Sequence, residues 1–353
     1  MTPSSPPRAP RVASPTPTRG APPADRSGPL RGAAGGSPSR GGLVSLAGVL
    51  LIVALVVAGA FMPKWLTFLL TMAASHGLVS LGIVLLMRGG VVSFGQGLVF
   101  AVGGYAAALA FNRLGFTDAL GLALAGGVAA TVVAAPFAPL LSRYRGIFFA
   151  MLTLAMSMVA YGVLVKTSAL GGSDGFNMGR PTLFGQALPD ARAGHVLYGV
   201  TIAFAGVLAL LARTYFDSTR GLVTQAVREN ELRVEYLGGS VREAMSINFL
   251  LAAFAGGSGG ALTVMSLGHI DPNFSYWTTS GEFVFVAILA GWQSVLAVFV
   301  ASTLLEVVRS FSSLYFPNTW QLSLGVFLLL MIRFLPRGIG SLWVDRGAKG
   351  DRP

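Results

Sequence analysis

Charged side chains are scarce in this chain and make up only 11% of its 353 residues. A soluble globular domain usually carries about 25% charged residues, which keep its surface in water. Hydrophobic residues account for 53% of the chain, and the mean hydropathy is +0.68. The composition therefore predicts a protein that lies in a lipid bilayer.

Cysteine is absent, which excludes disulfides, thiolate nucleophiles and cysteine-based metal sites. The three histidines, His76, His195 and His269, are far apart and show no metal-ligand spacing. Neither the zinc-protease motif HExxH nor the P-loop motif GxxxxGK(S/T) occurs. We expect no catalytic residue, no metal site and no cofactor bound by this chain itself.

Large apolar side chains are almost missing from residues 1–41, which hold ten of the 19 prolines and six arginines. Such a segment has too little apolar surface to offset the entropy lost on ordering, so it is predicted to be a disordered cytoplasmic arm. The net charge of +11 lies in this arm, in the loops and at the C-terminus, without a basic patch interleaved with aromatic residues. We expect it to set the orientation in the membrane and not to bind nucleic acid.

Residues 42–337 alternate apolar runs with short polar breaks, and are predicted to form the transmembrane domain. The fold class expected is an all-α integral membrane protein with about 8–10 transmembrane helices, since a bilayer core requires about 20 residues per helix. The expected spans lie near 43–62, 66–87, 97–112, 119–141, 146–166, 195–212, 246–268, 282–308 and 320–335. Because Arg and Lys concentrate on inner loops, the cytoplasmic side is expected to carry Arg88, Arg143, Arg145, the loop 213–245 and the tail 338–353.

Two of the apolar runs are interrupted. The run 282–308 contains "AGWQS" (Ala290–Ser294) and is too long for one crossing and too short for two, so we expect a broken or re-entrant segment. The run that begins with "GGVVSFGQG" is rich in glycine, which allows either close helix packing or a broken helix that lines a pathway. The pathway candidates are Ser93, Phe94, Gln96, Glu282 and Gly291.

Three ionisable residues, His76, Glu282 and Glu306, fall within apolar runs. A charge in the membrane is costly and usually faces the interior of the helix bundle. Glu282 opens its run, so it either lies at the membrane interface or faces the pathway. Glu306 is expected to pair with Arg309 on the same helix, and His76 is expected to be a hydrogen-bonded interior histidine.

Charge is concentrated in one loop. Residues 213–243 hold five arginines and five acidic residues, a balance that favours protein contact over binding to anionic lipid. A short amphipathic helix parallel to the membrane is expected there, ended by Gly238 and Gly239. Its apolar face would be formed by Val223, Val227, Val234 and Leu237. The alternative is a solvated helix with internal ion pairs.

Seven ordered stretches resemble the LivM-type permeases of branched-chain amino-acid ABC importers. They are "VSFGQGLVFAVGGYAAAL", "RGIFFAMLTLAMSM", "LGGSDGF", "AVRENELRVEYLGGSV", "GGSGGAL", "SGEFVFVAILAGWQSVLA" and "FLPRGIGSLW". The resemblance covers about residues 70–345. Two sites depart from the family pattern: Gln96 stands where "SFGH" has histidine, and Ala290–Gln293 stand where "LGGxGSLLGP" begins.

The resemblance implies a permease subunit in the bacterial cytoplasmic (inner) membrane. The distribution of Arg and Lys predicts that both termini lie in the cytoplasm. The partners implied by the resemblance are a LivH-type second permease, two ATP-binding cassette subunits that bind the ATP, and an external substrate-binding protein. It also implies that the charged loop docks on the ATP-binding subunits through Arg228, Glu229, Asn230, Glu231, Arg233, Val234, Leu237 and Gly238.

An ion-coupled secondary transporter is the alternative function, with Glu282 and Glu306 as the carboxylates placed to bind its ion. If the chain is an ABC permease, the sequence does not decide whether its solute is a branched-chain amino acid, another amino acid, urea or a short amide.

Overall fold

A computed structural model describes residues 38–186, 193–335 and 338–341, with side chains from residue 47 onward. Residues 43–353 are assigned to one compact unit, and the preceding unit is described only at residues 38–42. The predicted disorder of residues 1–37 and most of the predicted tail lie outside the described residues.

The described chain is almost wholly helical, which confirms the predicted all-α membrane class. The α-helices are α1 (Pro38–Gly59), α2 (Lys64–Arg88), α3 (Gln96–Leu114), α4 (Ala119–Ala134), α5 (Ala138–Leu141), α6 (Gly146–Lys166), α7 (Ala193–Asp217), α8 (Thr219–Glu229), α9 (Glu231–Tyr236), α10 (Val241–Leu267), α11 (Trp277–Ala290), α12 (Val295–Tyr315) and α13 (Trp320–Phe334). Two 3-10 turns, η1 (Ser168–Leu170) and η2 (Pro272–Ser275), and a two-stranded antiparallel pair, β1 (Phe176–Asn177) with β2 (His269–Ile270), complete it.

Each of the nine predicted spans corresponds to helix, and two of them are divided. The run 119–141 becomes α4 and α5, since Pro136 has no N–H to continue the helical hydrogen bonds. The run 282–308 becomes α11 and α12, which confirms the predicted break. Within the described residues, six helices are long and apolar enough to cross a membrane: α2, α3, α6, α7, α10 and α12.

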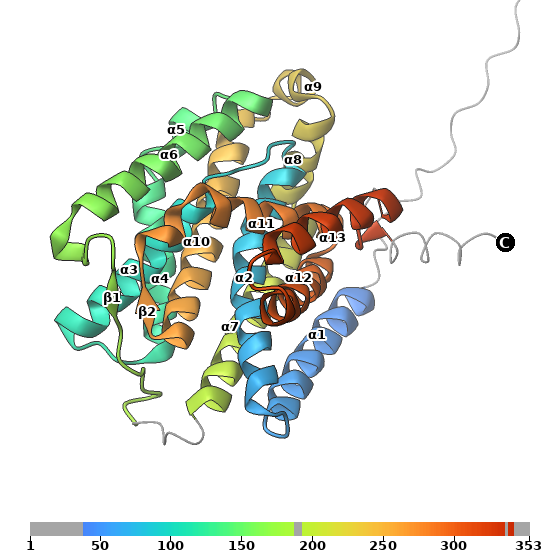
Figure 1. Ribbon diagram of the computed structural model, residues 1–353. Helices are drawn as coiled ribbons and strands as arrows, with labels where there is room; N and C mark the ends of the chain where they lie inside the picture. Colours follow the sequence, from blue (N-terminus) through green and yellow to red (C-terminus); the bar gives the residue numbers. More distant parts are fainter. Residues whose placement is uncertain (1–37, 187–192, 336–337, 342–353) are drawn as a thin grey trace, which may run out of the picture. The chain divides into compact units, whose positions relative to one another are not determined.

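Helices α2 and α10 lie at the centre, and α10 packs against α2, α3 and α4 (Figure 1). The contact with α3 and α4 depends on glycine. A Cβ atom on Gly257 would lie 2.6 Å from the Gly126 carbonyl oxygen, and one on Gly103 would collide with the Gly257 backbone. The prediction that small residues allow close helix approach is therefore confirmed for these three helices.

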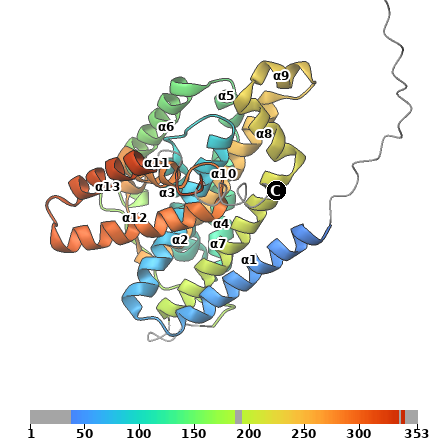
Figure 2. The same ribbon diagram turned by 90° about the vertical axis from the view of Figure 1, so that its right-hand side faces the viewer.

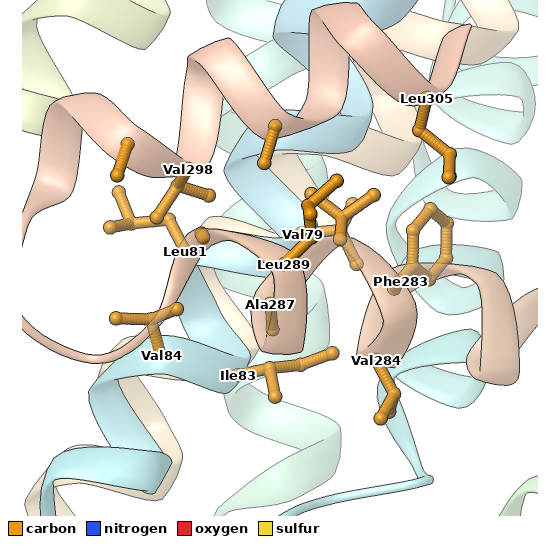
Figure 3. Close-up of a cluster of buried hydrophobic side chains, with 14 of the residues drawn as sticks. Val79, Leu81, Ile83, Val84, Phe283, Val284, Ala287, Leu289, Val298 and Leu305 are labelled. Carbon is orange, nitrogen blue, oxygen red and sulfur yellow. The ribbon is translucent and has the colours of Figure 1, made fainter. Parts of the chain in front are cut away.

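A second core joins α2, α11 and α12. Figure 3 shows Ile83 of α2 near Ala287 of α11, and Val298 of α12 next to Leu81 of α2. Helix α13 lies along α12 (Figure 2). This core fixes both sides of the break between α11 and α12.

The outward faces of several helices are apolar. Large hydrophobic side chains are exposed on α6 at Ile147, Phe148 and Val159, and on α13 at Leu329 and Phe334. Exposed apolar faces of this extent suit contact with lipid or with other subunits.

Candidate functional site: the charged loop and the helix breaks

The charged loop forms two short helices, α8 and α9, at one end of the molecule (Figure 1). Asn230 separates them: its backbone ends α8, and its side-chain oxygen accepts a hydrogen bond from the Arg233 N–H at 3.0 Å, which caps α9. The prediction of one continuous amphipathic helix is wrong, because this asparagine offers the backbone a cap in place of another helical turn. Gly238 follows α9 with φ +83°, as expected for a terminating glycine.

Most of the predicted apolar face of the loop packs inward. Val234 is only 7% exposed and packs, like Val227, against the protein's own core. Val234, which was expected among the docking residues, is therefore turned toward the core of its own chain. The exposed large apolar side chains of the loop are Leu222 (58%) on α8, Leu232 (65%) and Tyr236 (88%) on α9, and Leu237 (82%) directly after α9. Leu232 and Tyr236 lie on the face opposite Val227 and Val234, so the prediction that the apolar face of the helix docks on a partner did not include them.

The inner side of the loop is held by three arginine contacts with other segments. Arg145, at the start of α6, forms an ion pair with Glu231. Arg88, at the end of α2, donates to the Gln225 side chain at 3.3 Å, and its guanidinium lies 4.0 Å from the Phe216 ring centroid. The prediction that these basic segments share one end of the molecule is confirmed, and the side of the membrane stays a prediction.

The third arginine connects the loop to the break between α11 and α12. The guanidinium carbon of Arg228 lies 4.3 Å from the centroid of the Trp292 ring, which is cation–π geometry. Gly90 is close to the Arg228 backbone on the other side. The end of α8 thus contacts both interrupted regions. Glu229 and Arg233 are exposed and available to a partner.

The first interrupted region, residues 89–95, is enclosed by protein. The Phe94 N–H donates to Thr153 Oγ1 at 3.1 Å, and the Gly97 N–H donates to Ser280 Oγ at 2.9 Å. These bonds supply the partners that lipid would not. Ser93 and Gln96 are both buried, and the Gln96 amide oxygen has no hydrogen-bond partner within the described chain. Their role in a hydrated pathway stays a prediction.

The second interrupted region begins at Gly291, whose φ of +76° ends α11. The last carbonyls of α11 accept hydrogen bonds from a distant part of the chain: Ile339 N–H to Leu289 O and Gly340 N–H to Ala290 O, both at 2.9 Å. Residues 338–341, assigned to the tail from the sequence, therefore belong to the packed body. The buried side-chain oxygen of Gln293 has no hydrogen-bond partner among the described residues.

The intramembrane ionisable residues lie together. Arg309 Nη1 donates to Glu282 Oε2 at 2.8 Å, so the predicted pairing of Arg309 with Glu306 along one helix is wrong. Arg309 reaches across to α11 instead. Glu306 lies 3.7 Å from His76 Nδ1 on α2, which places His76 in the interior as predicted. Within the described residues, no group of three His, Asp or Glu side chains is placed to hold a metal ion.

A cavity of about 780 Å³ lies between α1, α2, α7 and α12. Most of its lining is apolar, with Arg88, Asp217 and Gln293 among the polar exceptions. Ser93, Phe94 and Gln96 are not part of its wall.

Comparison with known proteins decides the family. Residues 65–335 match the family described as the permease component of the branched-chain amino acid transport system. The chain belongs to this permease family. It is 28% identical over 312 residues to the high-affinity branched-chain amino acid transport system permease protein LivM of Escherichia coli K12, covering 82% of this chain and 73% of that protein. The LivM of Salmonella typhimurium LT2 is 29% identical over 292 residues, covering 76% and 68%. No solved structure matches the chain.

The permease family expected from the sequence is therefore confirmed. Members of this family are permease components of a transport system. The exposed loop and the helix breaks are therefore features of a permease.

Proposed function

We propose that the chain is the permease subunit of an ABC importer for branched-chain amino acids. It would lie in the bacterial inner membrane with both termini in the cytoplasm. Two ATP-binding cassette subunits, a LivH-type second permease and an external substrate-binding protein would complete the importer. Family membership and the similarity to LivM support the solute class.

The main support for the ABC role is that α8 and α9 have a buried inner side and an exposed outer side. Their inner side is fixed by Val227, Val234 and the Arg145–Glu231 ion pair. Their outer side leaves Leu237 and three further large apolar side chains, Leu222, Leu232 and Tyr236, exposed. A rigid base with an exposed apolar ridge suits a seat in a groove of another protein, because buried apolar anchors supply most interface energy.

The same segment offers a route by which partner movement would reach the membrane helices. Arg228 stacks on Trp292 in the break between α11 and α12. Arg88, at the end of α2, is bonded to Gln225 of α8. A displacement of α8 would therefore act on α2 and on this break together.

Uptake by purified subunits in liposomes tests the proposal. We expect L-leucine uptake only when the ATP-binding subunits, the second permease, the loaded binding protein and ATP are all present. Replacing leucine by urea or acetamide serves as the solute control. Uptake by this chain alone, driven by a proton or sodium gradient, would support the secondary-transporter alternative.

A further inference from the structure

Four ionisable side chains from three helices meet around one small cavity. His76 comes from α2, Glu282 from α11, and Glu306 and Arg309 from α12. Charges are costly inside a membrane and are there usually for a function. Buried ion pairs are also a weak source of stability, because desolvation offsets much of their attraction. The cluster therefore needs an explanation other than folding.

The charges of the cluster do not balance. Two carboxylates face one guanidinium, which leaves one negative charge in excess when His76 is neutral. Glu282 already accepts a hydrogen bond from Arg309 at 2.8 Å. In the described part of the chain, the only ion pair of Glu306 is with His76, and its 3.7 Å is longer than a hydrogen bond. Glu306 is thus the group placed to receive a further cation.

Arg309 has donors left for an anion beside that cation. A guanidinium carries five N–H donors, and within the described residues one of them is engaged, by Glu282. Glu306 and Arg309 are three residues apart on α12, a spacing that brings side chains together on one helix face. Both side chains also line the same small cavity, so a ligand with an ammonium and a carboxylate on one carbon atom could contact both.

The remaining wall of the cavity is apolar except for Ser302, whose hydroxyl donates to the Ala73 carbonyl at 2.6 Å. Phe283, Val286 and Leu305 line it, and Phe100 packs edge-on against Phe283 with ring centroids 4.9 Å apart. We propose that this cluster binds the zwitterion of an apolar amino acid during transport. Its α-ammonium contacts Glu306, its α-carboxylate contacts Arg309, and its side chain lies along the apolar wall. The inference rests on the proposed function and excludes urea and simple amides, which have no carboxylate for Arg309.

The cavity is closed in this conformation, since its volume of about 10 Å³ holds about one water molecule. Binding of an amino acid requires α12 to move away from α11. Residues 291–294 connect these two helices without helical structure, and Trp292 among them contacts Arg228 of the charged loop. Movement of that loop is thus linked to opening of the site.

Direct binding of tritiated L-leucine tests the inference. The permease is assembled with its second permease and ATP-binding subunits in nanodiscs, and the binding protein is left out. Loss of a charged hydrogen bond weakens binding roughly ten- to hundredfold, so we expect that change for Glu306→Gln and for Arg309→Lys. Asp174→Asn, the same carboxylate-to-amide change at an exposed position outside the charged loop, is the matched control and is expected to bind leucine as the unaltered chain does.

A competition series on the unaltered chain gives a result that does not depend on the variants. L-isoleucine is expected to displace the label, whereas leucinamide, which lacks the carboxylate, and 4-methylpentanoate, which lacks the ammonium, are expected to fail. Wild-type affinity in Glu306→Gln and Arg309→Lys would overturn the inference, as would equal competition by leucinamide. Leucine uptake by the full importer without any direct binding would also overturn it and leave the proposed function standing. Absence of leucine uptake by the full importer contradicts the proposed function itself.

Discussion

At the scale of single residues, Leu237 and Val234 illustrate how two neighbouring apolar side chains serve different purposes. Leu237 is exposed and Val234 is buried. We expect Leu237→Asp to release the ATP-binding subunits or to uncouple their ATP hydrolysis, because loss of an interface anchor costs about 1–4 kcal/mol. The permease itself should still insert. Co-purification and ATPase activity stimulated by the loaded binding protein measure both effects.

Val234→Asp is the informative comparison, since it places a charge in the protein's own core and should lower the yield of folded permease. Arg242→Ala, at the exposed margin of the loop, should leave association and ATPase activity unchanged. Full association and full stimulated ATPase activity of Leu237→Asp would show that the loop is a solvated connector.

The contact of Trp292 with Arg228 gives a second prediction at this scale. Cation–π contacts contribute about 0.5–2 kcal/mol, depending on their exposure. We expect Trp292→Ala to keep the subunits associated but to raise the amount of ATP hydrolysed per leucine taken up several-fold. Trp65→Ala, which removes an exposed indole at the start of α2, is the matched control. If Trp292→Ala leaves the amount of ATP hydrolysed per leucine unchanged, this contact takes no part in coupling.

At the scale of helices, the close contact of α10 with α4 predicts that a larger side chain at Gly257 destabilises the protein. A Cβ atom on Gly257 would meet the Gly126 carbonyl and the Ala130 side chain. Overpacking costs typically about 1–3 kcal/mol, so Gly257→Ala should lower the thermal unfolding temperature of the detergent-purified permease. Gly162→Ala on α6, where the added methyl group meets no atom within 4 Å, should leave that temperature unchanged or raise it slightly. Equal temperatures for both variants would contradict close packing of α10.

The elements were largely predictable from the sequence, whereas the pairing of their side chains was not. The positions of the spans follow from the length of the apolar runs. The break at Gly291 follows because the run 282–308 is too long for one membrane crossing and too short for two. These are local properties of the chain. Arg309 bonds to α11 and not along its own helix because tertiary packing brings Glu282 within reach, and no local pattern encodes that choice. Asn230 had a recognisable signal as a capping residue, which the assumption of one continuous helix overlooked.

At the scale of the whole molecule, the proline-rich arm is expected to be dispensable for assembly, because its composition leaves little apolar surface to pack. Deletion of residues 2–35 should preserve membrane insertion, subunit association and leucine uptake. Its arginines are expected to help only with the orientation of the first helix. Membrane fractionation and uptake assays compare the shortened and full-length chains. A shortened chain that inserts but no longer assembles with its partners would show that the arm makes a contact of its own.

The hydrogen bonds from Ile339 and Gly340 to the end of α11 have a consequence for biosynthesis. Ile339 follows Leu289 by fifty residues, and a ribosome makes about 5–20 residues per second. For several seconds after α11 leaves the ribosome, the donors that close its last turn therefore do not yet exist. During that interval the exposed carbonyls need water or the insertion machinery as a temporary partner, because lipid offers none. The break between α11 and α12 is thus completed only when residues 338–341 arrive.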